Sequence, residues 1–100
     1  MFIYNVTTHV SHSIKDAWLA WMKKKHIPEI LQTECFTKYQ FVRLLETDET
    51  EGQTYATQYY VDNEDKYKEY LEKHAPRLRD DAEKSWGNQL ISFRSIMEII

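Results

Sequence analysis

The sequence of 100 residues has only one cysteine, two glycines and two prolines, and it has no long apolar run. A single cysteine, Cys35, cannot form an internal disulfide, which favours a reducing compartment, and we expect a cytoplasmic protein. The scarcity of glycine excludes the glycine-rich loops of the common nucleotide-binding motifs. The first residues lack the basic start and apolar core of a signal peptide, and no stretch is apolar enough to span a bilayer. We therefore expect no membrane partner.

The chain also lacks an excess of positive charge. It has 13 basic and 16 acidic residues, for a formal net charge of −3. A nucleic-acid surface needs clustered positive charge, so we expect no nucleic-acid partner. The one basic run, residues 23–25, is interpreted as a solvated helix face. The length suits a single domain, residues 1–100, with one core.

What is present is a regular pattern of strands and helices. Alternating side chains predict strands over residues 2–10, 36–46, 53–61 and 91–99. Helical spacing follows Ser13 and again follows Asn63, two residues whose side chains can cap a helix, and Gly87 can end the second helix. Each helix is expected to be interrupted near a proline, Pro28 or Pro76, and the sequence leaves open whether the proline kinks or ends it.

The order of these elements is strand, helix, strand, strand, helix, strand. It predicts an α+β, ferredoxin-like βαββαβ fold, in which a four-stranded antiparallel sheet has both helices on one face. Right-handed crossovers place the first and third strands in the centre. Residues 25–30 and 73–78 support this, because similar His-x-Pro tracts recur 48 positions apart, one in each half. His26 and His74 therefore either donate to free carbonyls near a helix end or contact a ligand.

The strand pattern also predicts a sheet face that the helices leave open. We expect the helices to cover Phe2, Tyr4, Val6, Tyr55, Tyr59, Ile91 and Phe93. The opposite face would then carry Ile3, Asn5, Thr7, His9, Ala56, Gln58, Tyr60, Leu90, Ser92, Arg94 and Ile96. Such a half-apolar face is usually covered, and in a small protein a second copy is the simplest cover, so we expect a homodimer.

Arg94 is the most informative residue predicted for this open face. A guanidinium in a dimer cavity needs a carboxylate or an anionic ligand, because an unpaired buried charge is costly. The alternatives are an interface pair with Glu46 or Glu98, or simple exposure. Polar residues predicted to share the cavity can orient a small anionic or aromatic ligand. The candidate ligand-binding residues are Asn5, Gln58, Tyr60, Ser92, Arg94 and His74.

Metal and cofactor chemistry has little support in the sequence. His9 and His12 are three residues apart, as are His26 and Glu29, but two ligands do not make a site and no third is anchored. Cys35 has no histidine near it in the sequence and is interpreted as an ordinary thiol. We therefore expect no metal and no cofactor, and we assign no catalytic residue.

The residues 18–28, together with residues 3–6 and 74–79, resemble a family of short bacterial proteins classed only as a domain of unknown function. The resemblance extends over the whole chain. It implies a relationship to the dimeric α+β barrel group, in which two ferredoxin-like sheets face each other around a small-molecule pocket. Members of that group include cofactor-free monooxygenases, haem-degrading enzymes and proteins without known chemistry.

The haem-degrading members have an asparagine on the first strand, with a tryptophan and a histidine on the second helix. Asn5 and His74 match two of these positions, whereas residues 63–67 lack the tryptophan. The sequence thus predicts a homodimeric ligand-binding or interaction module. The alternative is a cofactor-independent, monooxygenase-like or other small-molecule enzyme that uses a sheet-face cavity.

Overall fold

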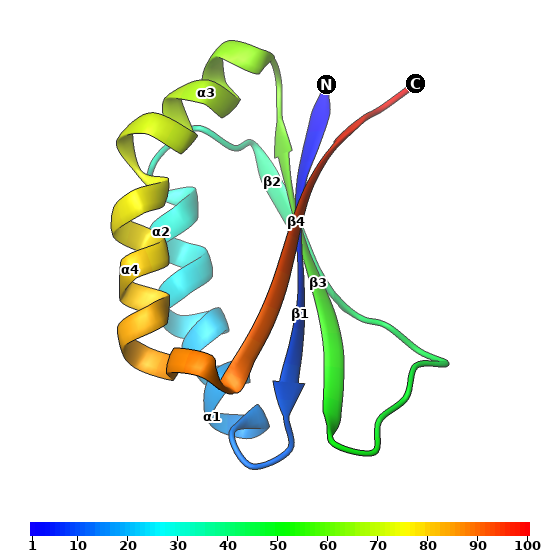
Figure 1. Cartoon of the computed structure of the whole chain (residues 1–100). Coiled ribbons are helices and arrows are strands. Elements are labelled where there is room, and N and C mark those ends of the chain that lie inside the picture. The colour runs from blue at the N-terminus through cyan, green and yellow to red at the C-terminus, as the bar shows by residue number, and fades with distance from the viewer.

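The computed structural model describes residues 1–100, and it has a four-stranded antiparallel sheet with all helices on one face (Figure 1). The elements are β1 (Phe2–Ser11), α1 (Lys15–Trp21), the π-helix η1 (Met22–His26), α2 (Ile27–Leu31), β2 (Lys38–Arg43), β3 (Gly52–Val61), α3 (Glu64–Lys73), α4 (Ala75–Trp86), the 3₁₀ turn η2 (Gly87–Gln89) and β4 (Leu90–Glu98). The strand order is β2-β3-β1-β4, so β1 and β3 are central. The predicted α+β architecture and strand order are confirmed.

The register of the sheet decides which side chains face the helices. In β1, Tyr4 lies opposite Tyr59 of β3, and both are buried beneath the helices. On the other side of β1, Val6 lies opposite Arg94 of β4. Residues directly opposite in antiparallel strands share a face, so Arg94 points to the helix side.

The predicted faces of β4 are therefore wrong. Leu90, Ser92, Arg94 and Ile96 lie on the helix side, and the intervening residues lie on the open face. Ile91 and Phe93, expected in the core, are 57% and 69% exposed. The strand lies at the sheet edge and has apolar residues on both faces. Alternation alone therefore predicts that the segment is a strand, but not which of its two faces packs against the helices.

The first helical segment runs through Pro28 without a break. Ile27 donates its N–H to Met22 O, five residues back, and the residues around it keep helical dihedrals. Pro28 falls in the first turn of α2, where the loss of an N–H is tolerated. The start of this segment differs from the prediction. Its N-cap is Ile14, without a side-chain cap, and the Ser13 hydroxyl bonds to Ser11 instead.

The second helical segment consists of two helices, α3 and α4. Asn63 caps α3 as predicted, because its Oδ1 accepts the Lys66 N–H at 2.9 Å. The helical dihedrals are interrupted at His74, where φ is −123°, and α4 begins with Ala75. Gly87 ends α4 with a φ of +58°, a value that favours glycine.

The core lies between the helices and the sheet and is rich in aromatic rings. Tyr4 is central to it, with ring centroids 5.5 Å from Tyr70 and 6.0 Å from Phe36. Phe36 precedes β2, which is shorter than the predicted strand. The other buried members of this cluster include Val10, Trp18, Met22, Ile27, Ile30, Tyr55, Val61 and Leu78. None of the helices has the length and apolar character needed to cross a bilayer.

Candidate functional site

A cavity of about 60 Å³ lies between the helices and the sheet. Side chains from β1, β3 and β4 form one wall, and side chains from α1, η1, α2, α3 and α4 form the other. Most of the lining is apolar or aromatic, including Trp18, Trp21, Met22, Ile30 and Leu78. Such a volume holds a few water molecules or a small chemical group.

Tyr59 lines this cavity and has a polar atom without a protein partner. The residue is 1% exposed, and its hydroxyl forms no hydrogen bond within the protein. Burial raises the pKa of Tyr59 far above its usual value, so the hydroxyl remains protonated. An unsatisfied buried hydroxyl costs about 1–3 kcal/mol, which a bound molecule can recover.

His26 is a second cavity residue with an unpartnered polar atom. Its ring stacks on Trp21, with centroids 4.5 Å apart and planes inclined by 18°, and its Nδ1 has no hydrogen-bond partner. Burial lowers the pKa of His26 to about 4, outweighing the opposing charges of Glu29 and Asp81. The imidazole is therefore neutral at pH 7 and can exchange a hydrogen bond with a ligand.

Two arginines lie where the cavity reaches the surface. Arg79 of α4 and Arg94 of β4 line both the cavity and an adjoining groove of about 220 Å³. Arg79 donates to the Tyr4 hydroxyl at 3.2 Å. Neither guanidinium forms an ion pair, although the carboxylate of Glu83 also lines the groove. Two unpaired guanidinium groups favour an anionic ligand at this opening.

The predicted ligand-binding residues fall into three separate places. Only the placement of Ser92 and Arg94 on the open face with the other strand residues is wrong. Asn5 and Gln58 lie opposite each other on the open face, with Tyr60 two positions along β3. Ser92 and Arg94 lie on the helix side because the faces of β4 are reversed. The sixth residue, His74, lies at the junction of α3 and α4. A ligand contact for any of them stays a prediction.

On the open face, Asn5 has a local structural role. Its amide donates to Thr7 Oγ1 at 2.9 Å and to Ser95 Oγ at 3.4 Å, whereas its Oδ1 has no partner. Tyr60 lies beneath Lys38, whose Nζ is 4.6 Å from the ring centroid. On β4, which carries Ser95, the side chains of Ile91 and Phe93 are exposed on the same face. The face is thus half apolar, as the sequence predicts.

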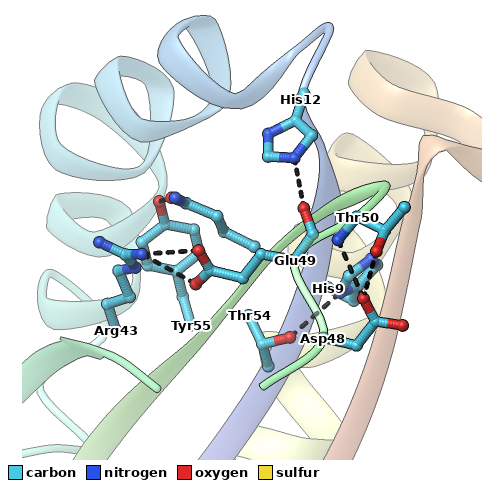
Figure 2. A network of polar contacts seen from close by, with 9 residues as sticks. His9, His12, Arg43, Asp48, Glu49, Thr50, Thr54 and Tyr55 are labelled. Atoms are coloured by element: carbon cyan, nitrogen blue, oxygen red, sulfur yellow. Dashed lines mark hydrogen bonds and ion pairs between the residues drawn. The ribbon is translucent and has the colours of Figure 1, made fainter. Parts of the chain in front are cut away.

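The two histidines near the end of β1 have different partners: His12 contacts the β2–β3 loop, and His9 contacts β3 (Figure 2). His12 Nε2 contacts the carbonyl oxygen of Glu49 at 2.7 Å, and His9 Nδ1 contacts Thr54 Oγ1 at 3.0 Å. Glu49 also binds Arg43 through both carboxylate oxygens at 2.8 Å. The two rings are thus engaged with different partners, and this network holds the loop against the sheet.

Cys35 has no histidine near it in the sequence, but the fold brings His74 close to it in space. Its Sγ donates to Glu69 Oε2 at 3.4 Å, and His74 completes a group whose ligating atoms lie within 4.8 Å of one another. Burial raises the pKa of the Cys35 thiol, and the hydrogen bond from Cys35 lowers the pKa of Glu69. The group lies outside the cavity lining.

Sequence reasoning missed most of the cavity. The strand pattern predicts the face of Tyr59 but not its contact with a cavity, and no sequence pattern indicates a role for Arg79. The available signal was the combination of a tyrosine at a buried strand position with an arginine on a core-facing helix. Each alone is common in cores or on surfaces, so only the three-dimensional contacts bring them together.

The chain belongs to the family described as Domain of unknown function (DUF4286), whose profile matches residues 1–100. The family description assigns no activity. No curated protein sequence is significantly similar to the chain.

Solved structures of other proteins share the fold. An ethd family protein from Bacillus halodurans is 18% identical, with both chains covered in full and a TM-score of 0.69. A dimeric ferredoxin-like protein from an uncultured marine organism is 12% identical, with 99% of this chain and 94% of that chain covered and a TM-score of 0.67. SnoaB, a cofactor-independent oxygenase from Streptomyces nogalater, is 10% identical, with 98% and 92% covered and a TM-score of 0.63. At these identities the likeness establishes the fold alone.

Proposed function

We propose that the protein is a homodimer that binds a small molecule with an anionic group and an apolar, aromatic body. The observation that carries this proposal is the helix–sheet cavity, in which Tyr59 Oη and His26 Nδ1 have no partners. A ligand that enters between α4 and β4 meets Arg79 and Arg94 first and the two unpartnered atoms further in.

The size of the cavity limits the ligand. The inner cavity of about 60 Å³ is too small for most metabolites, but it shares Arg79, Leu90 and Arg94 with the outer groove of about 220 Å³. The two volumes together approach the lower end of known ligand pockets, about 300 Å³. An aromatic carboxylate of one ring suits this space, with the ring against the apolar wall and the carboxylate between the arginines.

The dimer part of the proposal rests on the open face of the sheet. Figure 1 shows that no helix covers this face. Ile91 and Phe93 expose large apolar side chains there, and the ferredoxin-like relative from the marine organism is dimeric. A second copy would bury these side chains on the face opposite the cavity. Each protomer would then keep its own ligand site, with no pocket between the sheets.

Ligand binding can be tested with a panel of aromatic carboxylates and their neutral amides, followed by tryptophan fluorescence and NMR shifts. A charge-assisted hydrogen bond contributes about 1.5–3 kcal/mol, so Arg94→Gln should weaken carboxylate binding by at least about tenfold. Arg77→Gln, on an exposed position of α4, is the matched control and should bind like the wild type. If Arg94→Gln and Arg77→Gln bind the carboxylates equally well, the proposed site is wrong.

The dimer can be tested separately by light scattering after gel filtration. Phe93→Glu replaces a large apolar side chain of the proposed interface with a charge and should give monomers. Leu45→Glu is the control, because Leu45 is 71% exposed in the β2–β3 loop. A monomeric wild type at micromolar concentration would contradict the dimer but leave the cavity proposal intact.

A cofactor-independent oxygenase is the second candidate function, favoured by the neutral His26 imidazole beside an apolar cavity. Such a ring can take a proton from an activated substrate, which then reacts with O₂. With its pKa of about 4, His26 is a weak base, which restricts the substrates to acidic phenols and enols. Oxygen uptake with such substrates, lost in His26→Gln, would support this candidate, and equal uptake in both proteins would exclude His26 as the base.

A bacterial, cytoplasmic location completes the proposal. Cys35 is a free, buried thiol, which suits a reducing compartment. Cell fractionation with a specific antibody would test this, and recovery of the protein outside the cytoplasm would contradict it.

A further inference from the structure

We propose that Cys35, Glu69 and His74 form a zinc site with three protein ligands and one open position. These residues come from two separate parts of the chain: Cys35 from the loop between α2 and β2, Glu69 from α3, and His74 from the junction of α3 and α4. None of them lines the helix–sheet cavity, so this proposal is independent of the ligand site.

The distances between the three side chains are close to those of a tetrahedral site. Cys35 Sγ and Glu69 Oε2 are 3.4 Å apart, and all three ligating atoms lie within 4.8 Å of one another. Zinc bonds of about 2.0–2.3 Å place tetrahedral ligands roughly 3.3–3.7 Å apart. The Cys35–Glu69 distance thus already matches such a site, whereas any contact near 4.8 Å would have to shorten by roughly 1 Å when the side chains enclose the ion.

The thiol is held in position by its own loop. The Cys35 N–H donates to Thr33 Oγ1 at 3.3 Å, and the Thr33 hydroxyl donates to Ile30 O at 2.6 Å. Glu34, the residue between them, has a φ of +62°, which turns the chain sharply before Cys35. This arrangement directs the thiol at α3 without help from a metal, as a preorganised ligand requires.

The chemistry of the three groups suits zinc. Zinc binds thiolate, imidazole and carboxylate, whereas magnesium and calcium prefer oxygen ligands alone. On binding, the Cys35 S–H bond breaks, the proton passes to solvent and a sulfur–zinc bond forms. Thiolate and carboxylate together neutralise the two positive charges of the ion. Glu69 Oε2 would give up a long ion pair with Lys66, now 3.8 Å.

The open position follows from the burial of the three residues. Cys35 is 3% exposed and lies beneath the group, whereas Glu69 and His74 are half-buried. The ion would thus face solvent on the side away from Cys35 and keep a water molecule there. Three protein ligands with one water are typical of catalytic zinc sites, while four are typical of structural ones.

The proposal can be tested on the wild-type protein first. After treatment with a chelator, the protein should take up one equivalent of zinc, measured by mass spectrometry of the metal content. With cobalt in place of zinc, we expect a sulfur-to-cobalt charge-transfer band and the visible bands of a tetrahedral site. A cobalt spectrum without the sulfur band would overturn the proposal, and this result does not depend on any variant folding.

Single substitutions then identify the ligands. Cys35→Ser, Glu69→Gln and His74→Gln should each weaken zinc binding at least about 100-fold, because even an outer-shell partner contributes up to about that factor. Glu72→Gln on the same helix and the exposed His12→Gln are the matched controls. Circular dichroism checks that each variant folds. If the three variants bind zinc as tightly as the controls, the site is wrong.

Discussion

His26 and His74 each lie two residues before a proline near a helix junction, yet the two junctions are built differently. The first keeps helical dihedrals through a π-helical segment, and its imidazole is stacked on Trp21 at the cavity. The second interrupts the helix at the histidine, and its imidazole lies beside Cys35 and Glu69. The same short tract therefore lies in two different surroundings.

The two tracts also differ in the buried residue that each contains. In the first junction the residue between histidine and proline is Ile27, and in the second it is Ala75, although both are almost fully buried. A π segment widens the helix and re-aims its side chains, and such segments are often found at functional sites. Repetition of a motif thus predicts a repeated element, whereas the role of each copy depends on its neighbours.

The largest expected effect is at the first junction. Ile27→Ala removes a side chain that is 2% exposed, and the resulting cavity should lower the free energy of unfolding by about 2–5 kcal/mol. Urea denaturation followed by circular dichroism measures this. Leu45→Ala, at an exposed loop position, is the control and should change stability little. A loss as small as that of the control would mean that Ile27 does not anchor the junction.

The second prediction concerns acid stability. The pKa of His26 is about 4 in the folded protein and about 6.5 in the unfolded chain, so the unfolded chain binds more protons between these values. Stability from this group is therefore fully present above about pH 6.5 and falls as the pH drops towards 4, by about 3 kcal/mol in total.

His26→Gln should remove this part of the pH dependence, and urea titrations at several pH values would measure it. The wild-type protein under the same conditions is the reference. If His26→Gln and the wild type lose the same stability between pH 7 and 4, His26 is not the source of this part of the pH dependence.

The third prediction concerns the converse substitution at the second junction. Ala75→Ile gives the second junction the side chain of the first, but Ala75 is 1% exposed and has no space for three further carbons. Overpacking of this kind costs about 1–3 kcal/mol. Thermal unfolding measures the change, and Ala75→Gly separates overpacking from loss of the alanine. An Ala75→Ile variant as stable as the wild type would show that the second junction tolerates the first one's packing.

How much of the molecule the sequence predicts depends on the range of the interactions. The strand order, the Asn63 cap and the Gly87 stop follow from local patterns and are confirmed. The orientation of β4 does not follow from a local pattern. The alternation of Phe93 and Arg94 is equally compatible with either of the two side chains facing the helices. On an edge strand, both orientations leave many side chains exposed, so burial discriminates little between them.

The candidate sites depend on longer-range contacts still. Cys35 and His74 are close only because the α2–β2 loop packs against the end of α3, and no local sequence pattern predicts that contact. The cavity likewise joins Tyr59, Arg79 and Arg94 from three elements. Residue types with binding chemistry were visible in the sequence, whereas their grouping is a property of the packed fold.

The smallest expected effect compares the starts of the two helical segments. Asn63 accepts a hydrogen bond from the Lys66 N–H, so Asn63→Ala should cost about 1 kcal/mol. Ser13 makes no such bond to the helix, so Ser13→Ala should change stability by no more than about 0.5 kcal/mol. Urea denaturation resolves this difference, and Asn63→Ser, which keeps a capping hydroxyl, should recover most of the loss. Equal effects at the two positions would contradict the different capping of the two halves.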